Sequence, residues 1–482
     1  MTDYPREHAD RIRDFVRQNS VHLRRLRRRN SFFHSQVNRL VAAQVQAGSK
    51  VIDLGCSDGK LLQTLSGRLQ AGAGVDIDPE AVDEARDRLP DVLLECAAVE
   101  ELNEAPLPFP DYIVMSMILD QVYDVYTVLQ RVHSWSQPDT RIIVVSYNRL
   151  WRPLLRLAEL LRLKAENPAE SYIPRAEVKN LLESCKFEIT KELDGVLVPV
   201  RIPVIARLLN RWIAPLPFFR HFGLVHVTVA RPLQVKRRED TSISIIIAAR
   251  NEEGHIDELL ERIPRIAARQ EVIFVEGGSR DNTWAAIQKH VSAQDTTDGQ
   301  RIIALKQTGT GKGDAVRTGF AAASGDVLMI LDADISVPPE ELPRFFEVLQ
   351  DDTCEFANGS RLMYPMEERA MRFLNMLGNK FFGVLFTYLL GQPVRDTLCG
   401  TKVLRRESYE RLAANRSLFG DFDPFGDFDL LFGAAAMGLR IRDVPVHYKE
   451  RRYGETNISR FRHGVLLLRM SRIAAQRLKF VG

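Results

Sequence analysis

Residues 51–60 read VIDLGCSDGK, an apolar run that passes through an acid into a glycine-containing turn. The apolar run predicts a buried strand, and the residues from about Lys60 onward predict a helix. Gly55 and Gly59 lie in the turn, where glycine lets the backbone take positive φ and approach a ligand closely. This strand–turn–helix unit predicts a nucleotide-type cofactor site.

Strands and helices alternate on both sides of this turn. AGVDID precedes a helix predicted over 79–88, and DYIVMSM precedes a helix predicted over 121–134, which RIIVVSY follows. A late strand is predicted in LVHVTVARP at 224–232, and residues 1–47 are expected to be helical and amphipathic. This order predicts a parallel, doubly wound α/β sheet.

A second alternation follows a polar, charged stretch. SISIIIAARNEEGHIDELLERI at 242–263 predicts a strand, a turn and a helix, and EVIFVEGGSRDNTWAAIQKH at 271–290 repeats that order. We therefore expect an α/β protein of two tandem domains. The expected boundaries are 1–232 for the first domain, 233–242 for a linker and 243–482 for the second domain.

The composition limits the classes of function. The net charge of +3 over 482 residues is too weak to indicate a nucleic-acid partner. The five cysteines are scattered without metal-site spacing, which favours free thiols in a reducing compartment. The polar first residues predict no signal peptide, and no apolar run reaches the roughly 18 residues of a membrane span. We expect a cytoplasmic protein.

Arginines are concentrated near both ends of the chain, around residues 11–29 and 460–477. The tail at 459–480 is basic and amphipathic, a pattern typical of peripheral contact with an anionic membrane. The alternative for the N-terminal cluster is a solvated helix face. The expected location is therefore the cytoplasm, with peripheral contact at the inner face of the cell membrane through the basic ends.

VLMILDADIS at 327–336 places two acids at the end of another buried strand. Asp332 and Asp334 are two residues apart, so on a strand end their side chains point the same way. Two carboxylates and a diphosphate supply the hard oxygen ligands that suit Mg²⁺ or Mn²⁺. The sequence predicts a site where a metal ion neutralises a departing nucleoside diphosphate.

The first half resembles class I S-adenosylmethionine-dependent methyltransferases over roughly residues 30–230. The resemblance rests on DLGCSDG, VDIDP and PDYIVMSMILDQV. It implies a Rossmann-like sheet that binds S-adenosylmethionine, with these cofactor-site residues: Asp53, Gly55, Gly59, Asp76 and, facing the methyl acceptor, Ser116. Two departures are Ser57, in place of the usual middle glycine, and Ala98, in place of an acid often found near the adenine. The alternative is a methyltransferase fold that does not catalyse and serves as a docking module.

The second half resembles family 2 glycosyltransferases of the GT-A fold over roughly residues 241–455. SIIIAARNEE, VEGGSRDNTW and GTGKGDAVRTGFAAASGDVLMILDADISVPPEEL carry the resemblance. DTLCGTKVLRRE at 396–407 and FGDFDLLFGAAAMGLRIRDVPVHYKERRYGETNI are similar to the polyprenyl-phosphate sugar transferases of the dolichyl-phosphate mannose synthase type. These enzymes invert the anomeric carbon in a single displacement.

This resemblance assigns roles to residues of the second half. The implied nucleotide-sugar site contains Ala248, Arg250, Glu252, Glu276, Asp281, Lys312, Arg317 and Asp332. The implied metal ligands are Asp332 and Asp334, and the implied catalytic residues are Asp427, Asp429 and Arg452. Candidate holders of an acceptor phosphate are Arg361, Arg395, Arg405 and Arg452. Two alternatives remain: Arg317 could form a helix-surface pair with Asp314, and Asp427 could be a helix N-terminal acid.

The two resemblances together predict a bifunctional enzyme of glycan or glycolipid assembly. One half would transfer a methyl group, and the other would transfer a sugar from a UDP- or GDP-linked donor to a lipid phosphate or a glycan. The alternative is a glycosyltransferase only, joined to a non-catalytic methyltransferase-fold docking module.

Overall fold

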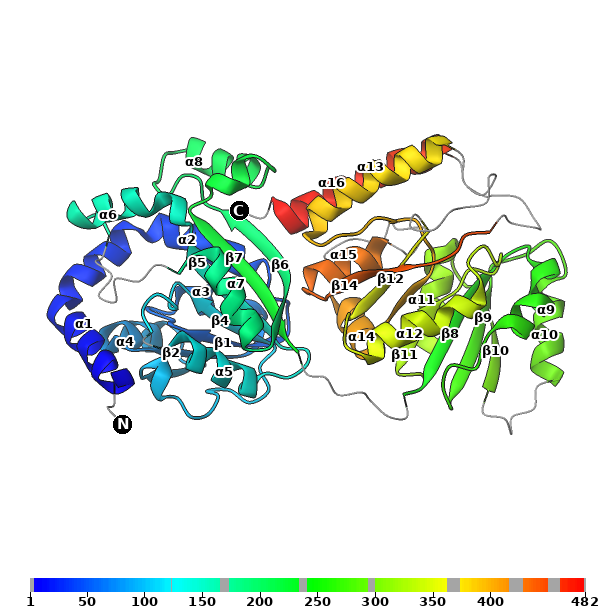
Figure 1. The fold of residues 1–482 in the computed structure, drawn as a ribbon, viewed down its shortest axis with the longest axis horizontal. Helices are drawn as coiled ribbons and strands as arrows, with labels where there is room; N and C mark the ends of the chain where they lie inside the picture. Colours follow the sequence, from blue (N-terminus) through cyan, green and yellow to red (C-terminus); the bar gives the residue numbers. More distant parts are fainter. Residues whose placement is uncertain are drawn as a thin grey trace. The chain divides into compact units, whose positions relative to one another are not determined.

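The computed structural model describes residues 4–122, 124–164, 173–233, 241–293, 300–361, 373–415, 428–449 and 460–480. Contacts between α-carbons divide the chain into two compact units. The first unit comprises Met1–Gln234 and Leu478–Gly482, and the second comprises Val235–Arg477. Each unit is built around its own seven-stranded sheet (Figure 1).

The sheet of the first unit has the order β3-β2-β1-β4-β5-β7-β6. Its strands are β1 (Ser49–Leu54), β2 (Leu69–Asp76), β3 (Leu93–Cys96), β4 (Tyr112–Ser116), β5 (Arg141–Tyr147), β6 (Phe187–Gly195) and β7 (Val225–Pro232). The first five strands in this order, β3, β2, β1, β4 and β5, run parallel, as the alternation of strands and helices predicts. β7 pairs antiparallel with β5, and β6 pairs antiparallel with β7, so the complete sheet is mixed rather than wholly parallel.

Two helices of the first unit, α4 (Pro79–Arg88) and α5 (Val125–Trp135), begin at aspartates that cap them. The other helices of this unit are α1 (Tyr4–Arg29), α2 (Ser31–Ala42), α3 (Lys60–Leu65), α6 (Arg152–Leu160), α7 (Arg175–Ser184) and α8 (Ile205–Leu208). α4 has the predicted bounds, because Asp78 accepts a hydrogen bond from the Ala81 amide (3.2 Å) and a proline follows it. α5 begins later than predicted, because Asp124 caps it through the Thr127 amide (3.1 Å).

The sheet of the second unit has the order β10-β9-β8-β11-β13-β12-β14. Its strands are β8 (Ile243–Ala249), β9 (Gln270–Glu276), β10 (Gln300–Lys306), β11 (Val327–Ile330), β12 (Phe356–Ser360), β13 (Lys402–Arg405) and β14 (Ile441–Pro445). The four strands from β10 to β11 are parallel. β13 runs antiparallel to both of its neighbours, and β14 is parallel to β12. The predicted class of two tandem α/β domains is confirmed, with a mixed sheet in each.

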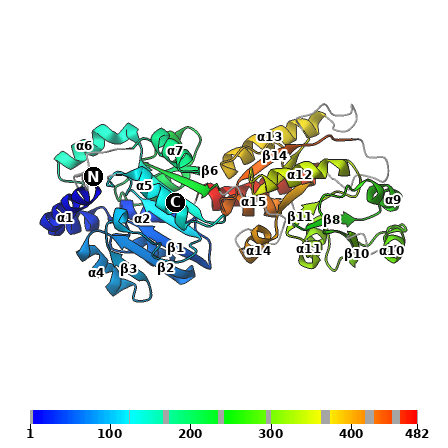
Figure 2. The ribbon, with the colours of Figure 1, turned by 60° about the horizontal axis from the view of Figure 1, so that its bottom comes forward.

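Helices cover both faces of the second sheet. They are α9 (Glu253–Arg262), α10 (Thr283–Ala293), α11 (Lys312–Ala322), α12 (Leu342–Gln350), α13 (Phe373–Leu390), α14 (Arg406–Ala414), α15 (Phe428–Ala436) and α16 (Arg460–Ala474). Figures 1 and 2 show α11 and α12 on opposite faces. The alternation along β8 explains this, because Ile245 packs in one core with Phe345 of α12 while Ile246 faces Gly319 of α11.

The described helices include none that is both long enough and apolar enough to cross a membrane.

In both sheets the strand ends that carry the predicted site residues lie at one edge, because the strands concerned are neighbours and parallel. Ligands of open α/β sheets bind at this carboxyl edge. The sites of both units are therefore sought there.

Candidate functional sites

The turn after β1 takes the backbone conformation that its glycines permit. Gly55 and Gly59 have φ of +82° and +70°, and Ser57 between them has φ of +48°. A Cβ on Gly55 would lie 2.8 Å from the Ile118 Cδ1 atom, so a larger residue would force that side chain to move. Serine therefore occupies a left-handed position in this turn where the family usually has glycine.

Asp53 is a buried carboxylate with an unsatisfied oxygen. Asp53 is only 2% exposed, and its Oδ1 atom has no hydrogen-bond partner among the described residues. Burial, reinforced by the nearby Asp76, raises the pKa of Asp53 from 3.8 to about 7. A buried, unpaired acceptor is costly unless a ligand supplies a donor, so Asp53 is suited to a cationic or donating ligand.

Asp76, at the end of β2, organises the same turn. Its Oδ2 atom accepts the Ser57 amide (2.7 Å), and its Oδ1 atom accepts the Asp78 amide (2.9 Å). Burial raises the pKa of Asp76, while these two amides oppose the rise. Because each carboxylate oxygen has two lone pairs, Asp76 can still accept from a ligand hydroxyl.

A cavity of about 540 Å³ opens at this edge of the first sheet. Asp53, Gly55, Asp76 and Ser116 all line it, and its volume is within the range of small-ligand pockets. Gly59 instead starts α3 and packs against α4, where a Cβ would lie 3.0 Å from the Ala85 Cβ. The unsatisfied oxygen of Asp53 and the glycine turn fit the methionine part of S-adenosylmethionine.

Helix α1 forms part of the cavity wall and is held by ion pairs. Arg27 donates to Asp78 at 2.6 Å, and Arg24 pairs with Glu84 at 2.7 Å. The cavity lining includes Ile12, Phe15, Leu23 and Leu26, all from α1. Part of the N-terminal arginine cluster is thus engaged within the unit.

Further polar residues line the cavity beyond the predicted site. Tyr147 ends β5 and stacks on Phe33 with 6.2 Å between ring centroids, and the Lys164 Nζ atom lies 5.5 Å from the Tyr147 ring. Burial and the nearby Lys60 lower the pKa of His34, which favours a neutral imidazole. Tyr147 stands at a strand end, as Ser116 does, so the same reasoning could have predicted it, but the sequence analysis missed it. Nothing in the sequence places His34 or Lys164 beside the cofactor turn.

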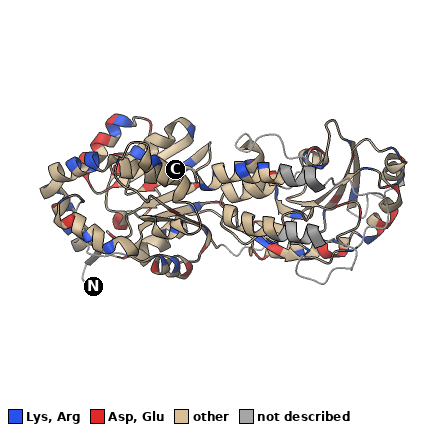
Figure 3. Cartoon of the chain, turned by 90° about the horizontal axis from the view of Figure 1, so that it is seen from above, with Lys and Arg blue, Asp and Glu red and all other residues tan. Residues whose placement is uncertain are grey.

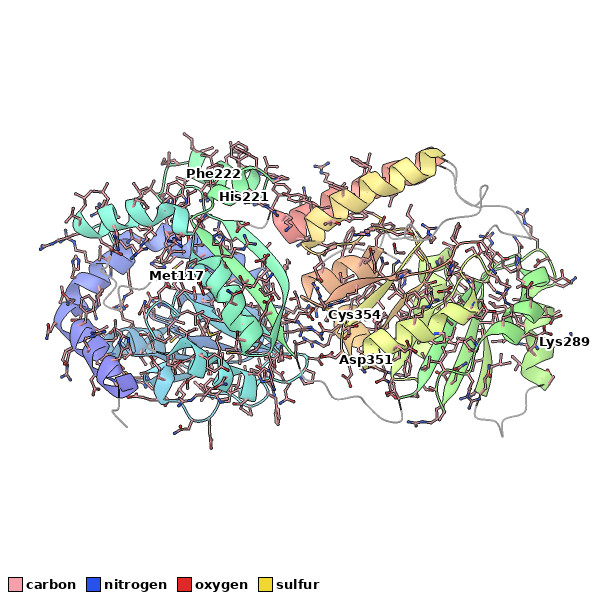
Figure 4. The ribbon with its side chains drawn as sticks, viewed as in Figure 1. Met117, His221, Phe222, Lys289, Asp351 and Cys354 are labelled. Atoms are coloured by element: carbon pink, nitrogen blue, oxygen red, sulfur yellow. The ribbon has the colours of Figure 1, made fainter. Side chains whose placement is uncertain are left out.

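The turn after β4 contributes to the wall of this cavity. Met117 follows β4 with φ of +59° and lines the cavity, and Figure 4 shows it between α1 and the sheet. A non-glycine residue in this conformation is uncommon and often marks a functional turn. The turn directs the chain after Ser116 along the cavity.

The second unit places an ion pair where the acidic motif was predicted. Lys312, the first residue of α11, donates from Nζ to Oδ1 of Asp332 at 2.6 Å. Burial alone would raise the pKa of Asp332, but the charges of Lys312, Arg361 and Lys402 outweigh it and the pKa is lowered. Asp334 accepts the Ser336 amide on Oδ1 at 3.0 Å. Asp332 is therefore held ionised among cations.

Gly400 closes over this ion pair. A Cβ built on Gly400 would overlap both the Asp332 carboxylate and the Lys312 ammonium group. Lys402, two residues later, is fully buried and donates to Oδ1 of Asn358 at 3.0 Å. Gly400 and Lys402 lie in the segment that resembles the polyprenyl-phosphate transferases, but their place at the site was not predicted.

The four arginines that were candidate phosphate holders differ in their surroundings. Arg361 donates to both oxygens of buried Asp396, at 2.7 and 2.9 Å, and lies 4.9 Å from the Tyr448 ring centroid. Arg405 donates to a backbone carbonyl of α12 at 2.8 Å, and Arg395 is exposed. Arg452 lies outside the described residues.

The acids assigned to the nucleotide pocket connect the loops that follow β8 and β9. Glu252 accepts from His255 Nδ1 at 2.8 Å, and Asp281 accepts the Glu253 amide at 3.2 Å. Glu276, at the end of β9, accepts the Ser279 amide. The bond between Asp281 and the Glu253 amide joins the two loops at the carboxyl edge, and the other two bonds lie within one loop each. Of the two remaining residues, Ala248 in β8 is half-buried and Arg250 is exposed.

The predicted catalytic acids are only partly described. Asp429 lies in the first turn of α15 and shares a small cavity with Arg317 of α11 and Tyr409 of α14. Arg317 also lies 3.8 Å from Asp314, one turn earlier on α11. Asp429 and Arg317 therefore line one small cavity, while Asp332 contacts Lys312. Asp427 lies outside the described residues.

A metal ion at Asp332 and Asp334 would need ligands from the substrate. The described residues contain no group of three or more His, Cys, Asp or Glu side chains placed to hold an ion. Mg²⁺ commonly binds through one or two carboxylates together with substrate phosphates and water. Two hard carboxylates two residues apart fit such an ion when a diphosphate is present.

Comparisons with known proteins agree with this division. Residues 244–413 match the family "Glycosyl transferase family 2", and residues 24–192 match the family "Methyltransferase domain". A dolichyl-phosphate hexose transferase of Haloferax volcanii is 31% identical over 228 residues, which are 47% of this chain and 90% of that protein. An undecaprenyl-phosphate 4-deoxy-4-formamido-L-arabinose transferase of Pseudomonas fluorescens is 30% identical over 46% of this chain. The match spans 61% of that relative, less than two thirds of its length.

Among solved structures, the chain is similar to a methyltransferase of Thermotoga maritima described as a possible histamine N-methyltransferase. The sequence identity is 16% and the TM-score 0.35, over 47% of this chain and 100% of the other.

Proposed function

The chain belongs to glycosyl transferase family 2 through its second half, and we propose that it is a bifunctional enzyme of glycan or glycolipid assembly. In this proposal the second unit transfers a sugar from a UDP- or GDP-linked donor to a polyprenyl phosphate or a glycan, with inversion. The first unit transfers a methyl group from S-adenosylmethionine. We place the protein in the cytoplasm, in peripheral contact with the inner face of the cell membrane.

The ion pair at the end of β11 supports the proposed sugar transfer. Asp332 and Lys312 are in contact, and Lys402 and Arg361, which is paired with Asp396, also lower the pKa of Asp332, so the site combines an ionised carboxylate with clustered cations. Such a site suits a diphosphate that gains negative charge as the sugar departs. Mg²⁺ or Mn²⁺ held by Asp332 and Asp334 would supply further neutralisation of that charge.

The acceptor decides whether the second unit needs a base. A phosphate acceptor is already an anion and requires only positioning, whereas a hydroxyl acceptor must lose its proton. We propose a phosphate acceptor, because Lys312, Arg361 and Lys402 all act on Asp332, and Asp429 lines another small cavity together with Arg317. The two relatives, a dolichyl-phosphate hexose transferase and an undecaprenyl-phosphate 4-deoxy-4-formamido-L-arabinose transferase, also support this choice.

The unsatisfied oxygen of Asp53 in the 540 Å³ cavity is the observation that carries the first half of the proposal. Asp53 would accept from the ammonium group of S-adenosylmethionine, the turn at Gly55 would allow close backbone approach, and Asp76 would accept from the ribose. The cofactor would supply an electrophilic methyl group. Ser116, at the end of β4, would face the acceptor, and α1 would exclude water.

Calorimetric titration of the full chain tests the two halves separately. We expect saturable binding of S-adenosylmethionine and, with Mn²⁺ present, of either UDP or GDP. The double variant Asp332→Asn/Asp334→Asn should lose metal-dependent nucleotide binding and donor turnover while keeping S-adenosylmethionine binding. Nucleotide binding without S-adenosylmethionine binding would favour a docking module, and full activity of the double variant would refute the metal site.

A further inference from the structure

Two segments of the first unit expose large apolar side chains to solvent. On α6, Leu154, Leu157 and Leu160 are exposed, and Leu160 reaches 80%. Leu155 of the same helix is buried and lines the cavity. α6 is therefore apolar on two sides and has a protein partner on only one of them, which is unusual for a surface helix.

The second segment, residues 199–222, shows the same property without a long helix. Ile205 and Leu208 of α8 are each 53% exposed, Phe218 is 68% exposed, and Trp212 is 41% exposed. Exposed aromatic residues of this density are characteristic of interfaces with a partner or a membrane. Figure 1 shows α6 and α8 along the same upper edge of the first unit.

Hydrogen bonds join the two segments into one face. The Trp151 indole, next to α6, donates to the Phe222 carbonyl at 2.9 Å. Asn148 donates from Nδ2 to the carbonyls of His221 (2.9 Å) and Gly223 (2.8 Å). Figure 4 shows His221 and Phe222 at this edge, below α8. We call residues 149–164 and 199–222 together the apolar-basic face.

The charge on this face is one-sided. Residues 199–222 contain no Asp or Glu, and residues 149–164 contain only Glu159, which binds Lys164 at 2.6 Å. The exposed arginines are Arg149, Arg156, Arg162, Arg201, Arg207 and Arg211. Within the described parts of the chain, none of these arginines forms an ion pair with a carboxylate. Figure 3 shows the chain from above, the side on which α6 and α8 lie in Figure 1, with Lys and Arg in blue.

We propose that the apolar-basic face docks the first unit onto an anionic lipid bilayer. Leu160, Phe218 and their exposed neighbours would insert among the acyl chains, and the unpaired arginines would bind anionic head groups. Trp212, with Arg211 5.5 Å from its ring centroid, is suited to the head-group level, where tryptophan is enriched. A protein partner of matching acidity or a second copy of the chain would cover the apolar side chains. An anionic bilayer would cover these scattered side chains and would also neutralise the arginines.

The apolar-basic face lies next to the cavity of the first unit. Leu155, Ala158 and Leu163 from the first segment, and Pro199 and Val200 from the second, line the cavity that holds the cofactor turn. Part of the cavity wall and the docking face are thus made by the same two segments. A lipid-linked methyl acceptor would pass from the bilayer into the cavity, a step that rests on the proposed methyl transfer, whereas the docking itself does not.

Flotation of the full chain with vesicles tests the docking without any activity. We expect binding to vesicles of phosphatidylglycerol mixed with phosphatidylcholine and little binding to phosphatidylcholine alone. Leu160→Glu should weaken partitioning by roughly tenfold or more, because a leucine that would insert among the acyl chains is replaced by a charge. Val21→Glu is the matched control, since Val21 on α1 is also 80% exposed.

Removing charge gives a second test that keeps the apolar surface intact. Arg207→Gln/Arg211→Gln should weaken binding to the anionic vesicles by about thirtyfold, since each cation near such a surface contributes on the order of fivefold. Arg28→Gln/Arg29→Gln removes the same charge from exposed positions of α1 and should have a smaller effect. Equal losses in both pairs, or no binding of the unaltered chain, would overturn the proposal. So would a sedimentation experiment without lipid in which Leu160→Glu converts a dimer to a monomer.

Discussion

Asparagine in place of Asp53 is expected to stabilise the ligand-free first unit and to weaken its binding of S-adenosylmethionine. Asp53 is 2% exposed, and its Oδ1 atom has no hydrogen-bond partner among the described residues. Ionising this group in the folded protein is therefore unfavourable. Burial and Asp76 raise its pKa from 3.8 to about 7.

The sign of the stability effect follows from the raised pKa. The folded chain keeps the Asp53 proton up to about pH 7, whereas the unfolded chain loses it near 3.8. Asp53 thus contributes stability that is complete below the unfolded pKa and is lost as the pH rises through about 7. The difference between the two pKa values corresponds to at most roughly 4 kcal/mol above pH 7. Asparagine cannot ionise, so the variant avoids this loss.

The effect on binding has the opposite sign. The ammonium group of S-adenosylmethionine would pair with ionised Asp53, and a hydrogen bond to a charged group contributes about 1.5–3 kcal/mol. The Asp53→Asn variant should bind roughly tenfold to a hundredfold more weakly in calorimetry. Thermal unfolding at about pH 8 should show a higher melting temperature for the variant, with the difference shrinking toward about pH 5.

Asp76→Asn is the matched control for this prediction. Both oxygens of Asp76 accept backbone amides, so an asparagine would turn its amide group toward one of those donors and destabilise the turn. We expect Asp76→Asn to lower both stability and affinity. If Asp53→Asn also lowered the melting temperature above pH 7, or left the affinity unchanged, the argument that Asp53 is a buried charge awaiting a cationic ligand would be wrong.

Two further substitutions test the other contacts. Gly400→Ala should reduce the kcat/KM of sugar transfer by roughly tenfold to a hundredfold, because the new methyl group would separate Asp332 from Lys312; unchanged transfer kinetics would contradict the assigned donor site. Arg27→Met should lower the free energy of unfolding by roughly 2–3 kcal/mol in chemical denaturation, because buried Asp78 loses its 2.6 Å partner. A change below about 0.5 kcal/mol would show that this ion pair does not hold α1.

The elements with local signals could be predicted from the sequence. The bounds of α4 follow from Asp78 and the proline after it, and the start of α3 follows from Gly59. β6 was not predicted as a strand, and β7 could not be oriented, because an apolar run indicates a strand but not its direction or neighbour. The strand LVHVTVARP was therefore predicted correctly as a strand while its antiparallel pairing was not predicted.

The sites show the same limit. Asp53, Asp76, Asp332 and Asp334 stand at strand ends, so the parallel order of the strands is enough to locate them. Gly400 reaches Asp332 from a segment about seventy residues later, on a path through β12 and α13 that no local pattern specifies.

The two sites use opposite electrostatic arrangements on the same structural plan. In the first unit Asp53 is buried without a compensating cation, and the neighbouring Asp76 raises its pKa further. In the second unit the Asp332 side chain is 26% exposed, and Lys312 and other cations lower its pKa. A site with an unpaired carboxylate favours a cationic ligand, and a site with clustered cations favours an anionic one. A sulfonium donor in the first unit and a diphosphate donor in the second satisfy both conditions, whereas exchanging the two ligands would satisfy neither.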